Sequence, residues 1–332
     1  MMRKGIVLLI GSVLLLSAGC EDNFNPKVPV RDEYVLQCFI EAQAGRSSST
    51  VIALLARVYD VDGFDPSVNT TDPSVAGAAL TLRLFGPSYL MKDTLRFNPD
   101  SLRYGSKQLY YRVRMSLPAP ADPISISARL PDGRILSAQT VAPPVRVVTP
   151  SIDFPNGITT KMNSPPGTPR SLTLSWGGDA VVDPHVFFPQ LLIYYTKMGD
   201  TMEVPGTMAV PLRYVAGTNG PTAFFPPYTM ENSLTFDFDA IDSAMANISA
   251  GDPQKYKYGV HAASFILMEY DTPLSKYYSS VHGSLDQFSI RVDQLVYSNI
   301  GGGIGIFGTY FVNQSKFFLD WGYVRSFGYN YR

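Results

Sequence analysis

The stretch Leu109-Tyr110-Tyr111-Arg112-Val113-Arg114-Met115-Ser116-Leu117 predicts a β-strand with one buried face. Hydrophobic residues occupy every second position of the stretch, and arginine or serine occupies most of the positions between them. Successive side chains of a strand point to opposite faces of the sheet, so a period of two separates a buried face from a solvated face. The same period recurs before and after this stretch, and we therefore expect a protein that is mostly β.

Six segments in the first half of the chain read as strands. They are residues 34–41, 51–59, 80–85, 109–117, 124–130 and 135–141. Pro131-Asp132-Gly133 predicts a tight turn before the last of them, because proline fixes φ and glycine tolerates positive φ. Six strands in about 115 residues are typical of one β-sandwich. We expect an immunoglobulin-like sandwich over residues 33–147.

The second half of the chain, residues 148–332, begins where a cluster of prolines interrupts the pattern. These are Pro143, Pro144 and Pro150. Strand-like segments return at residues 172–176, 187–195, 234–238, 256–270 and 288–292. The return of the period of two predicts a second β-sandwich-like domain over residues 148–332.

Two short helices are expected in this second domain. One covers residues 241–248, with Asp239 or Asp242 as the acid at its N-terminus. The other covers residues 272–281, where Thr272 is a cap residue and a proline follows in the first turn. The predicted fold class is therefore mostly β, with two tandem sandwich-like domains and short helices in the second.

The composition gives no electrostatic case for binding nucleic acid, because the net charge is −1. Charged residues make up only 17% of the chain, whereas there are 20 tyrosines and 19 phenylalanines, and this balance favours sheet. The two cysteines are Cys20 and Cys38. If Cys20 carries lipid, no internal disulfide forms, and Cys38 is expected to be a small buried hydrophobe within a strand.

The N-terminus has the three parts of a secretion signal. The basic pair Arg3-Lys4 precedes an apolar run over residues 5–16, and the small residues of Ser17-Ala18-Gly19-Cys20 follow. The alternative is a membrane-spanning helix, but the run has about a dozen residues where a span needs roughly 20. We expect residues 1–19 to be a signal peptide and residues 20–32 to be the lipidated cysteine and a linker.

The cleavage region Leu16-Ser17-Ala18-Gly19-Cys20 resembles the lipobox of bacterial lipoproteins, with Ser17 in the place where leucine is usual. The resemblance implies that Cys20 carries fatty acyl chains, such as palmitate, that hold the protein on a membrane. Glu21 and Asp22 resemble the signal that sends Bacteroidota lipoproteins to the cell surface, and the alternative is an ordinary polar tether. The expected location is the outer membrane, with a lipid anchor and exposure at the cell surface.

The most distinctive stretch of the chain is Tyr297-Ser298-Asn299-Ile300-Gly301-Gly302-Gly303-Ile304-Gly305-Ile306-Phe307-Gly308. It resembles the C-terminal signature N-I-x-G-G-x-G-I-F-G of a Bacteroidota family of outer-membrane lipoproteins of unknown function. The matching residues are Asn299, Ile300, Gly302, Gly303, Gly305, Ile306, Phe307 and Gly308. The Tyr-rich segment 272–278 also resembles the family, whereas the tail beyond Tyr310 is longer than expected for it. The resemblance implies an N-terminal sandwich, a second β-rich domain and, because members often stand beside TonB-dependent receptors, an accessory role in uptake.

The glycines of this signature also have a physical interpretation. Glycine lets the backbone adopt positive φ and approach another segment closely, and Ile304, Ile306 and Phe307 are suited to a core. The pattern therefore predicts a tight turn that feeds a final buried strand. The alternative is a phosphate-binding loop, but no Lys-Ser/Thr pair and no helix follow it.

Residues with catalytic or metal-binding chemistry are few. The three histidines are His185, His261 and His282, and none stands in a zinc-binding H-E-x-x-H pair. No G-x-S-x-G elbow marks a nucleophile, although a dispersed Ser-His-Asp triad stays open. The acidic stretch 60–65 is similar to a calcium loop, but its glycine is misplaced and a solvated turn is favoured. We expect no catalytic residue, no metal and no cofactor.

Aromatic residues are the best candidates for contact with a ligand or partner. Phe224, Phe225 and Tyr228 lie in a rigid Pro-rich loop, where rings offer contact area at low entropic cost. The alternative for this loop is a plug that seals the domain interface. A second group in the C-terminal tail comprises Phe317, Phe318, Trp321 and Tyr323. The tail either packs as a last strand or adds to the edge of a partner's sheet.

These features predict a non-enzymatic, surface-exposed outer-membrane lipoprotein. Its expected role is that of a binding or accessory subunit of a TonB-dependent transporter, with the membrane and a β-barrel receptor as partners. One alternative is a structural surface component similar to fimbrillins, which are also lipoproteins built from two β-domains. The other alternative is a hydrolase of unknown substrate.

Overall fold

The structure is a computed structural model that describes residues 33–43, 47–58, 72–97, 107–151, 171–177, 185–199, 202–218, 220–282 and 297–332. Cys20, the expected signal peptide, the linker, the acidic stretch 60–65 and the expected strand 288–292 lie outside the described residues. The protein is mostly β, with several sheets and few helices, which confirms the predicted fold class. No helix within the described ranges is long and apolar enough to cross a membrane.

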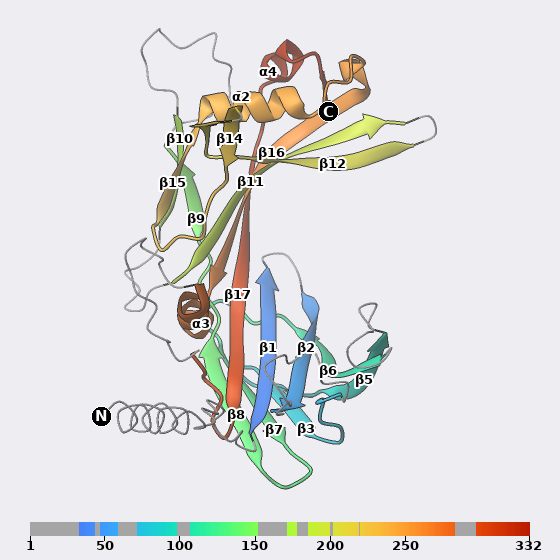
Figure 1. Ribbon diagram of the computed structural model, residues 1–332, viewed down its shortest axis with the longest axis vertical. Coiled ribbons are helices and arrows are strands. Elements are labelled where there is room, and N and C mark those ends of the chain that lie inside the picture. The colour runs from blue at the N-terminus through green and yellow to red at the C-terminus, as the bar shows by residue number, and fades with distance from the viewer. Residues whose placement is uncertain are drawn as a thin grey trace, which may run out of the picture.

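A large sheet extends through the whole molecule (Figure 1). Its strands lie in the order β12-β11-β16-β17-β1-β2-β6-β5, and β18 pairs with β16 beside this path. The strands are β1 (Tyr34–Gln43), β2 (Ser48–Arg57), β5 (Lys92–Phe97), β6 (Lys107–Ser116), β11 (Phe187–Met198), β12 (Glu203–Val210), β16 (Tyr258–Tyr270), β17 (Ile304–Phe317) and β18 (Asn330–Tyr331). Alternating burial along β1 and β2 reflects the period of two in their sequences.

The first lobe, at the bottom of Figure 1, is a two-layer sandwich. There the large sheet faces a second sheet in the order β4-β3-β7-β8. The strands of this second sheet are β3 (Ala79–Arg83), β4 (Ser88–Leu90), β7 (Pro123–Arg129) and β8 (Ile135–Val141). Leu36, Cys38, Leu82 and Ile126 lie in the core between the layers. Burial raises the pKa of the Cys38 thiol to about 12, so this cysteine is unreactive at neutral pH, as expected.

The second lobe, at the top of Figure 1, packs helices and a small sheet against the other end of the large sheet. The small sheet has the order β15-β10-β9, and β13 and β14 form a separate hairpin. These elements are β9 (Val147–Pro150), β10 (Ser171–Gly177), β13 (Arg213–Gly217), β14 (Gly220–Phe224), β15 (Ser233–Asp237), α2 (Phe238–Asn247), η3 (Lys255–Lys257) and α4 (Trp321–Ser326). Helix α3 (Thr272–His282) lies lower in Figure 1, beside β17. Trp176 lies at the centre of this core, with its ring centroid 5.7 Å from those of Phe187 and Phe265.

Strand β17 belongs to both lobes. Its first part pairs in parallel with β1, from Val35↔Ile304 to Gln43↔Val312. Its last part pairs antiparallel with β16, from Tyr270↔Tyr310 to Ala263↔Phe317. As a result, Ile300 and Phe307, which fall within the predicted C-terminal domain, lie in the core of the first lobe. The packing of the first lobe therefore depends on residues 300–312, which are far from the rest of that lobe in sequence.

The glycine signature allows β17 to approach β1. A Cβ atom on Gly305 would overlap the carbonyl group of Leu36, and a Cβ atom on Gly303 would lie 2.6 Å from the carbonyl oxygen of Tyr34. Gly305 also has a φ of +121°, which other residues rarely adopt. The predicted turn that feeds a buried strand is confirmed, although β17 is followed by α4 and β18 and is not the final strand.

Other signature residues hold the turn in place. The side chain of Asn299 donates a hydrogen bond to the Phe307 carbonyl oxygen (2.7 Å) and accepts one from the Phe307 backbone N–H (2.9 Å). Gly302, with a φ of +82°, passes close to the backbone of Ile135 at the start of β8. Gly308 leaves room for the side chain of Leu274 in α3. The signature is therefore a structural element of the first lobe.

The start of one predicted helix and the cap residue of the other need correction. Helix α2 begins at Phe238 and not at residue 241, with Asp237 at the N-cap position and Asp239 in the first turn. Helix α3 begins at Thr272, but Thr272 is not its cap, because the carboxylate of Asp271 accepts the Leu274 N–H at 2.9 Å. A side-chain oxygen that accepts from the third helical residue is the mark of an N-cap.

Candidate ligand-binding cavity

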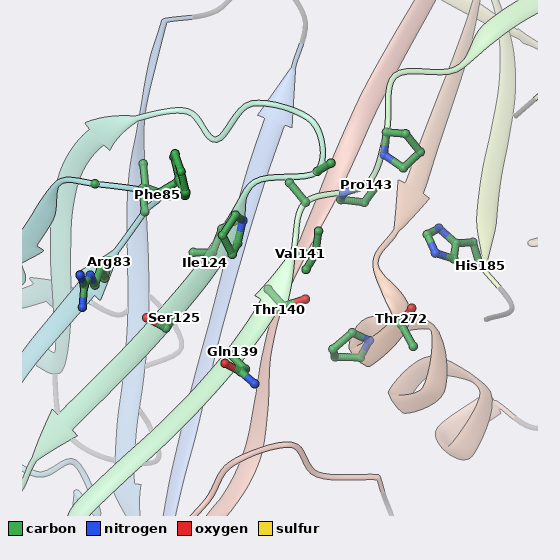
Figure 2. Close-up of a pocket in the computed structure, with 17 residues that line it drawn as sticks. Arg83, Phe85, Ile124, Ser125, Gln139, Thr140, Val141, Pro143, His185 and Thr272 are labelled. Carbon is green, nitrogen blue, oxygen red and sulfur yellow. The ribbon is translucent and has the colours of Figure 1, made fainter. Parts of the chain in front are cut away.

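A cavity of about 1050 Å³ lies where the end of the second sheet of the first lobe meets α3 and the segment before β11 (Figure 2). Its walls come from both lobes. They are formed by Arg83, Leu84, Phe85, Gly86, Ala121, Pro123, Ile124, Ser125, Gln139, Thr140, Val141, Ala142, Pro143, Pro144, His185, Thr272 and Pro273. Most of these residues are apolar, and none of them is acidic.

Strand ends and turns position the cavity walls. Arg83 is the last residue of β3, and Phe85 and Gly86 form the turn that leads to β4. Gly86 has a φ of +114°, which suits glycine in a tight turn. Pro123 and Ile124 begin β7, and Val141 ends β8 before the Pro143-Pro144 pair turns the chain away. The cavity therefore sits on the irregular rim of a rigid sheet, where binding residues often lie.

His185 forms the wall opposite Arg83 in Figure 2. Its Nδ1 lies 2.6 Å from the Oε1 atom of Glu269 on β16. The side chain of Glu269 is fully buried and also forms a two-pronged ion pair with Arg146, at 2.8 Å from Nε and 2.7 Å from the terminal nitrogen. A carboxylate without a proton only accepts hydrogen bonds, so Nδ1 is the donor in this contact, and Nε2 has no hydrogen-bond partner among the described residues.

Asp271 lies directly behind the cavity wall and joins three elements. Its Oδ2 atom accepts hydrogen bonds from the Thr140 hydroxyl on β8 (2.5 Å) and the Thr309 N–H on β17 (2.6 Å). Its Oδ1 atom accepts the Leu274 N–H of α3. Burial raises the pKa of the Asp271 carboxyl to about 6, against the opposing effect of these hydrogen bonds.

The side chains that form these buried hydrogen bonds and ion pairs are together called the polar hub. Its members are Thr140, Arg146, His185, Glu269, Asp271, Thr309 and Asn313. Asn313 belongs to it because its side-chain oxygen accepts the backbone N–H of Arg146 at 3.0 Å. The hub lies between the two hydrophobic cores and shares Thr140 and His185 with the cavity. Because burying charges without partners is costly, these bonds hold the cavity wall in one arrangement.

The predicted aromatic loop does not line the cavity. Phe224 and Phe225 are exposed, and the Arg213 guanidinium lies 5.4 Å from the Phe224 ring centroid. Tyr228 is half-buried, and its ring packs 4.8 Å from Tyr278 of α3. Tyr228 therefore packs within the protein, and the two phenylalanines stay at the surface.

The aromatic tail is divided in the same way. Phe318 and Trp321 are exposed, and the Arg325 guanidinium lies 5.0 Å from Trp321. Phe317 packs against the second core, and Tyr323 is buried with its hydroxyl donating to Asp242 at 2.9 Å. Burial removes Tyr323 from the candidate contact residues. The tail packs on its own chain through α4 and through β18, which pairs in parallel with β16.

Neither of the two remaining histidines is among the described residues that line the cavity. His261 lies mid-strand with Nε2 3.3 Å from the Thr196 hydroxyl, which is a structural position. Of His282 only the backbone is described, at the end of α3. No group of three or more His, Cys, Asp or Glu side chains in the described ranges is arranged to hold a metal ion.

Sequence reasoning missed the polar hub. Glu269 is a carboxylate in an otherwise apolar strand, and Arg146 stands between prolines and valines, so each is a charge in a buried context. A charged residue within an apolar segment is the sequence signal that could have revealed the buried ion pair. It did not reveal the pairing, because 123 residues separate the two side chains in the chain.

Comparisons with family models and with curated protein sequences found no relative of the chain. No protein-family model matches the chain, and no curated protein sequence matches it. The fold and cavity alone define the class: a mostly-β protein with sandwich-like layers and an open, largely apolar cavity at the junction of its lobes.

Proposed function

We propose that the protein is a non-enzymatic binding protein, held by lipid on Cys20 at the surface of a bacterial outer membrane, and that it takes its ligand in the cavity between the lobes. The observation that carries the proposal is the cavity itself, with about 1050 Å³, apolar walls and two placed basic groups, Arg83 and His185. Small-molecule sites are concave and mostly apolar, with volumes of roughly 300–1,000 Å³ and a few polar groups that set orientation.

An accessory role beside a TonB-dependent transporter is the proposed setting. The resemblance of the signature at 297–308 supports it. The exposed rings of Phe224, Phe225, Phe318 and Trp321 provide apolar surface of the kind that protein partners cover. A surface binding protein in this position would collect a ligand and pass it to the β-barrel receptor.

Metabolic labelling with palmitate tests the anchor. The wild-type protein is expected to take up label in the outer membrane, and Cys20→Ala is expected to take up none. Label on Cys20→Ala would refute the anchor.

Purification from the native outer membrane in mild detergent, followed by mass spectrometry of the co-purifying chains, tests the partner. A β-barrel receptor is expected to co-purify with the wild-type protein, and a double variant Phe318→Ser/Trp321→Ser is expected to recover less of it. Recovery of the monomer alone would defeat the transporter role. Recovery of filaments of this chain would support the structural alternative.

A hydrolase is the second candidate, and one observation favours it. The Nδ1 atom of His185 is bound to a buried carboxylate while the ring borders the cavity, an arrangement that suits a general base. No hydroxyl of the described residues is hydrogen-bonded to its Nε2 atom, so a nucleophile would have to be water. Turnover of a panel of aryl esters that disappears in His185→Gln would support hydrolysis, and absence of turnover in the wild-type protein would exclude these esters as substrates.

A further inference from the structure

The described residues of the cavity walls include basic groups and no acidic ones. Among the described lining residues, Arg83 carries a guanidinium and His185 an imidazole, and there is no Asp or Glu. The side chain of Arg83 forms no ion pair or hydrogen bond with the described part of the chain. An exposed cation beside an apolar wall attracts an anion more strongly than it would in open solvent, because the wall lowers the local dielectric constant.

The carboxylates behind the wall do not offset this charge. Glu269 is paired with Arg146 through two short contacts and has no exposed surface. The side chain of Asp271 is also buried, and its two oxygens accept hydrogen bonds from Thr140, Thr309 and Leu274, so they do not face the cavity. Among the described residues, the charge exposed in the cavity is therefore that of Arg83.

Between these two groups the wall is hydrophobic. Figure 2 shows Phe85, Ile124 and Val141 between Arg83 on one side and His185 on the other. Phe85 is 76% exposed and Val141 is 53% exposed, so both present apolar surface to the solvent. Covering such surface is the main source of affinity for an apolar ligand body.

We infer that the ligand is an elongated amphipathic organic acid. Its acid group pairs with the guanidinium of Arg83, its apolar body covers Phe85, Ile124 and Val141, and a polar group at its far end hydrogen-bonds to Nε2 of His185. The inference rests on the proposed function, because it assumes that the cavity is the binding site. It adds to the proposed function the chemical class of the ligand: the ligand carries an acid group, and neutral or cationic compounds are expected to bind less tightly.

Displacement of a fluorescent amphiphile tests the class. The protein is the mature chain, residues 20–332, with Cys20→Ala, so that no detergent is needed. Anilinonaphthalene sulfonate serves as the probe, and dodecanoate, dodecanol and dodecylamine serve as competitors with one apolar body and three head groups. Dodecanoate is expected to displace the probe at about tenfold lower concentration than dodecanol, and dodecylamine least well.

Two arginine variants locate the acid group. Arg83→Gln is expected to weaken dodecanoate binding about tenfold and to leave dodecanol binding unchanged. Arg129→Gln is the matched control, because Arg129 is an exposed arginine on the neighbouring strand β7 that does not line the cavity. Equal displacement by dodecanoate and dodecanol, or no effect of Arg83→Gln, would overturn the inference.

A cavity-filling pair separates failure of the ligand class from failure of the proposed function. Ser125→Trp places a large ring in the cavity, and Ser127→Trp places the same ring two residues along β7, outside the cavity. Probe binding is expected to be lost only in Ser125→Trp, and Gln139→Trp replaces it if that variant does not fold. Probe binding that survives both cavity variants, or no probe binding in the parent chain, would refute the cavity as the site. Blocked binding without head-group preference would refute the organic acid alone.

A hydroxyl series tests the His185 contact. Terminally hydroxylated fatty acids of increasing length are expected to include one that binds several-fold more tightly than its unhydroxylated parent. That preference is expected to vanish in His185→Gln. A preference that persists in His185→Gln, or that no chain length shows, would overturn this part of the inference.

Discussion

Two junctions that include residues of β17, the glycine signature and the polar hub, are built by opposite means. At the signature, the residue that makes the contact is a glycine, which has no side chain, so the backbone of Gly305 packs directly against the backbone of Leu36. At the polar hub, 123 residues separate Arg146 from Glu269, and buried charges and hydrogen bonds make the junction. The first junction is closed to any ligand, whereas the second opens on the cavity through Thr140 and His185.

This difference indicates which junction serves function. Close backbone packing is the least costly way to join two strands, because it buries no charge. A buried Arg–Glu pair with a histidine is a costly way to join two lobes, and hydrophobic replacements of such pairs are often as stable. We therefore interpret the hub as a support for the shape and polarity of the cavity wall, and the signature as a structural joint.

The largest effect is expected at the hub. Glu269→Gln leaves the Arg146 guanidinium buried without a countercharge, so the free energy of unfolding is expected to fall by about 3–5 kcal/mol in urea titrations. Asp132→Asn at the exposed Arg134 pair is the control and is expected to have little effect. Equal losses in the two variants would contradict the assignment of Glu269 as a buried partner.

A hydrophobic replacement sharpens the same point. The double variant Arg146→Met/Glu269→Leu removes both charges, so it is expected to regain much of the stability that Glu269→Gln loses. Binding of anilinonaphthalene sulfonate is nevertheless expected to weaken, because His185 loses the carboxylate that orients it. Full binding in this double variant would count against a supporting role for the hub.

The signature is expected to respond to a single methyl group. Gly305→Ala places a Cβ atom against the Leu36 carbonyl at a φ of +121°, so a loss of about 3 kcal/mol in unfolding free energy is expected. Gly301→Ala is the control, because the nearest atom to its Cβ is 3.4 Å away. If the two variants are equally stable, β17 does not pair with β1 in the register described.

Acidity is expected to act on the hub through Asp271. Asp271 has a pKa of about 6 in the folded protein and 3.8 as the reference value, so between these values the folded state binds more protons than the unfolded state. Stability from this group therefore falls as the pH rises from about 4 to about 6, by about 3 kcal/mol at most. The stability difference between wild type and Asp271→Asn, measured across that range, is expected to fall with rising pH. A difference that is flat or rises would be inconsistent with a raised pKa.

The smallest effect is expected at the turn of the signature. Asn299→Ala removes both hydrogen bonds to the Phe307 backbone, so a loss of about 1–2 kcal/mol is expected in the same titrations. Asn299→Asp keeps the acceptor for the Phe307 N–H and is expected to lose less. Identical losses would show that the side-chain acceptor contributes nothing.

The sequence predicts the local features of the fold but not the contacts between distant segments. Local signals are readable: the alternation at 109–117 and 124–130 predicts β6 and β7, and the glycines at 302, 303 and 305 predict close backbone approach. Long-range pairing is not readable, because nothing near Ile304 specifies a parallel partner at Val35. The cavity is missed for the same reason, since its walls combine Arg83, Thr140 and His185 from separate segments.

Hydrogen–deuterium exchange with and without anilinonaphthalene sulfonate tests the central claim that the cavity is the binding site. The backbone N–H groups of residues 124–125, 139–142 and 185–186 are expected to exchange more slowly with the probe bound, while the signature at 299–308 is unchanged. Protection of the aromatic loop at 224–228 or of the tail at 317–323, with none at the cavity, would contradict the claim.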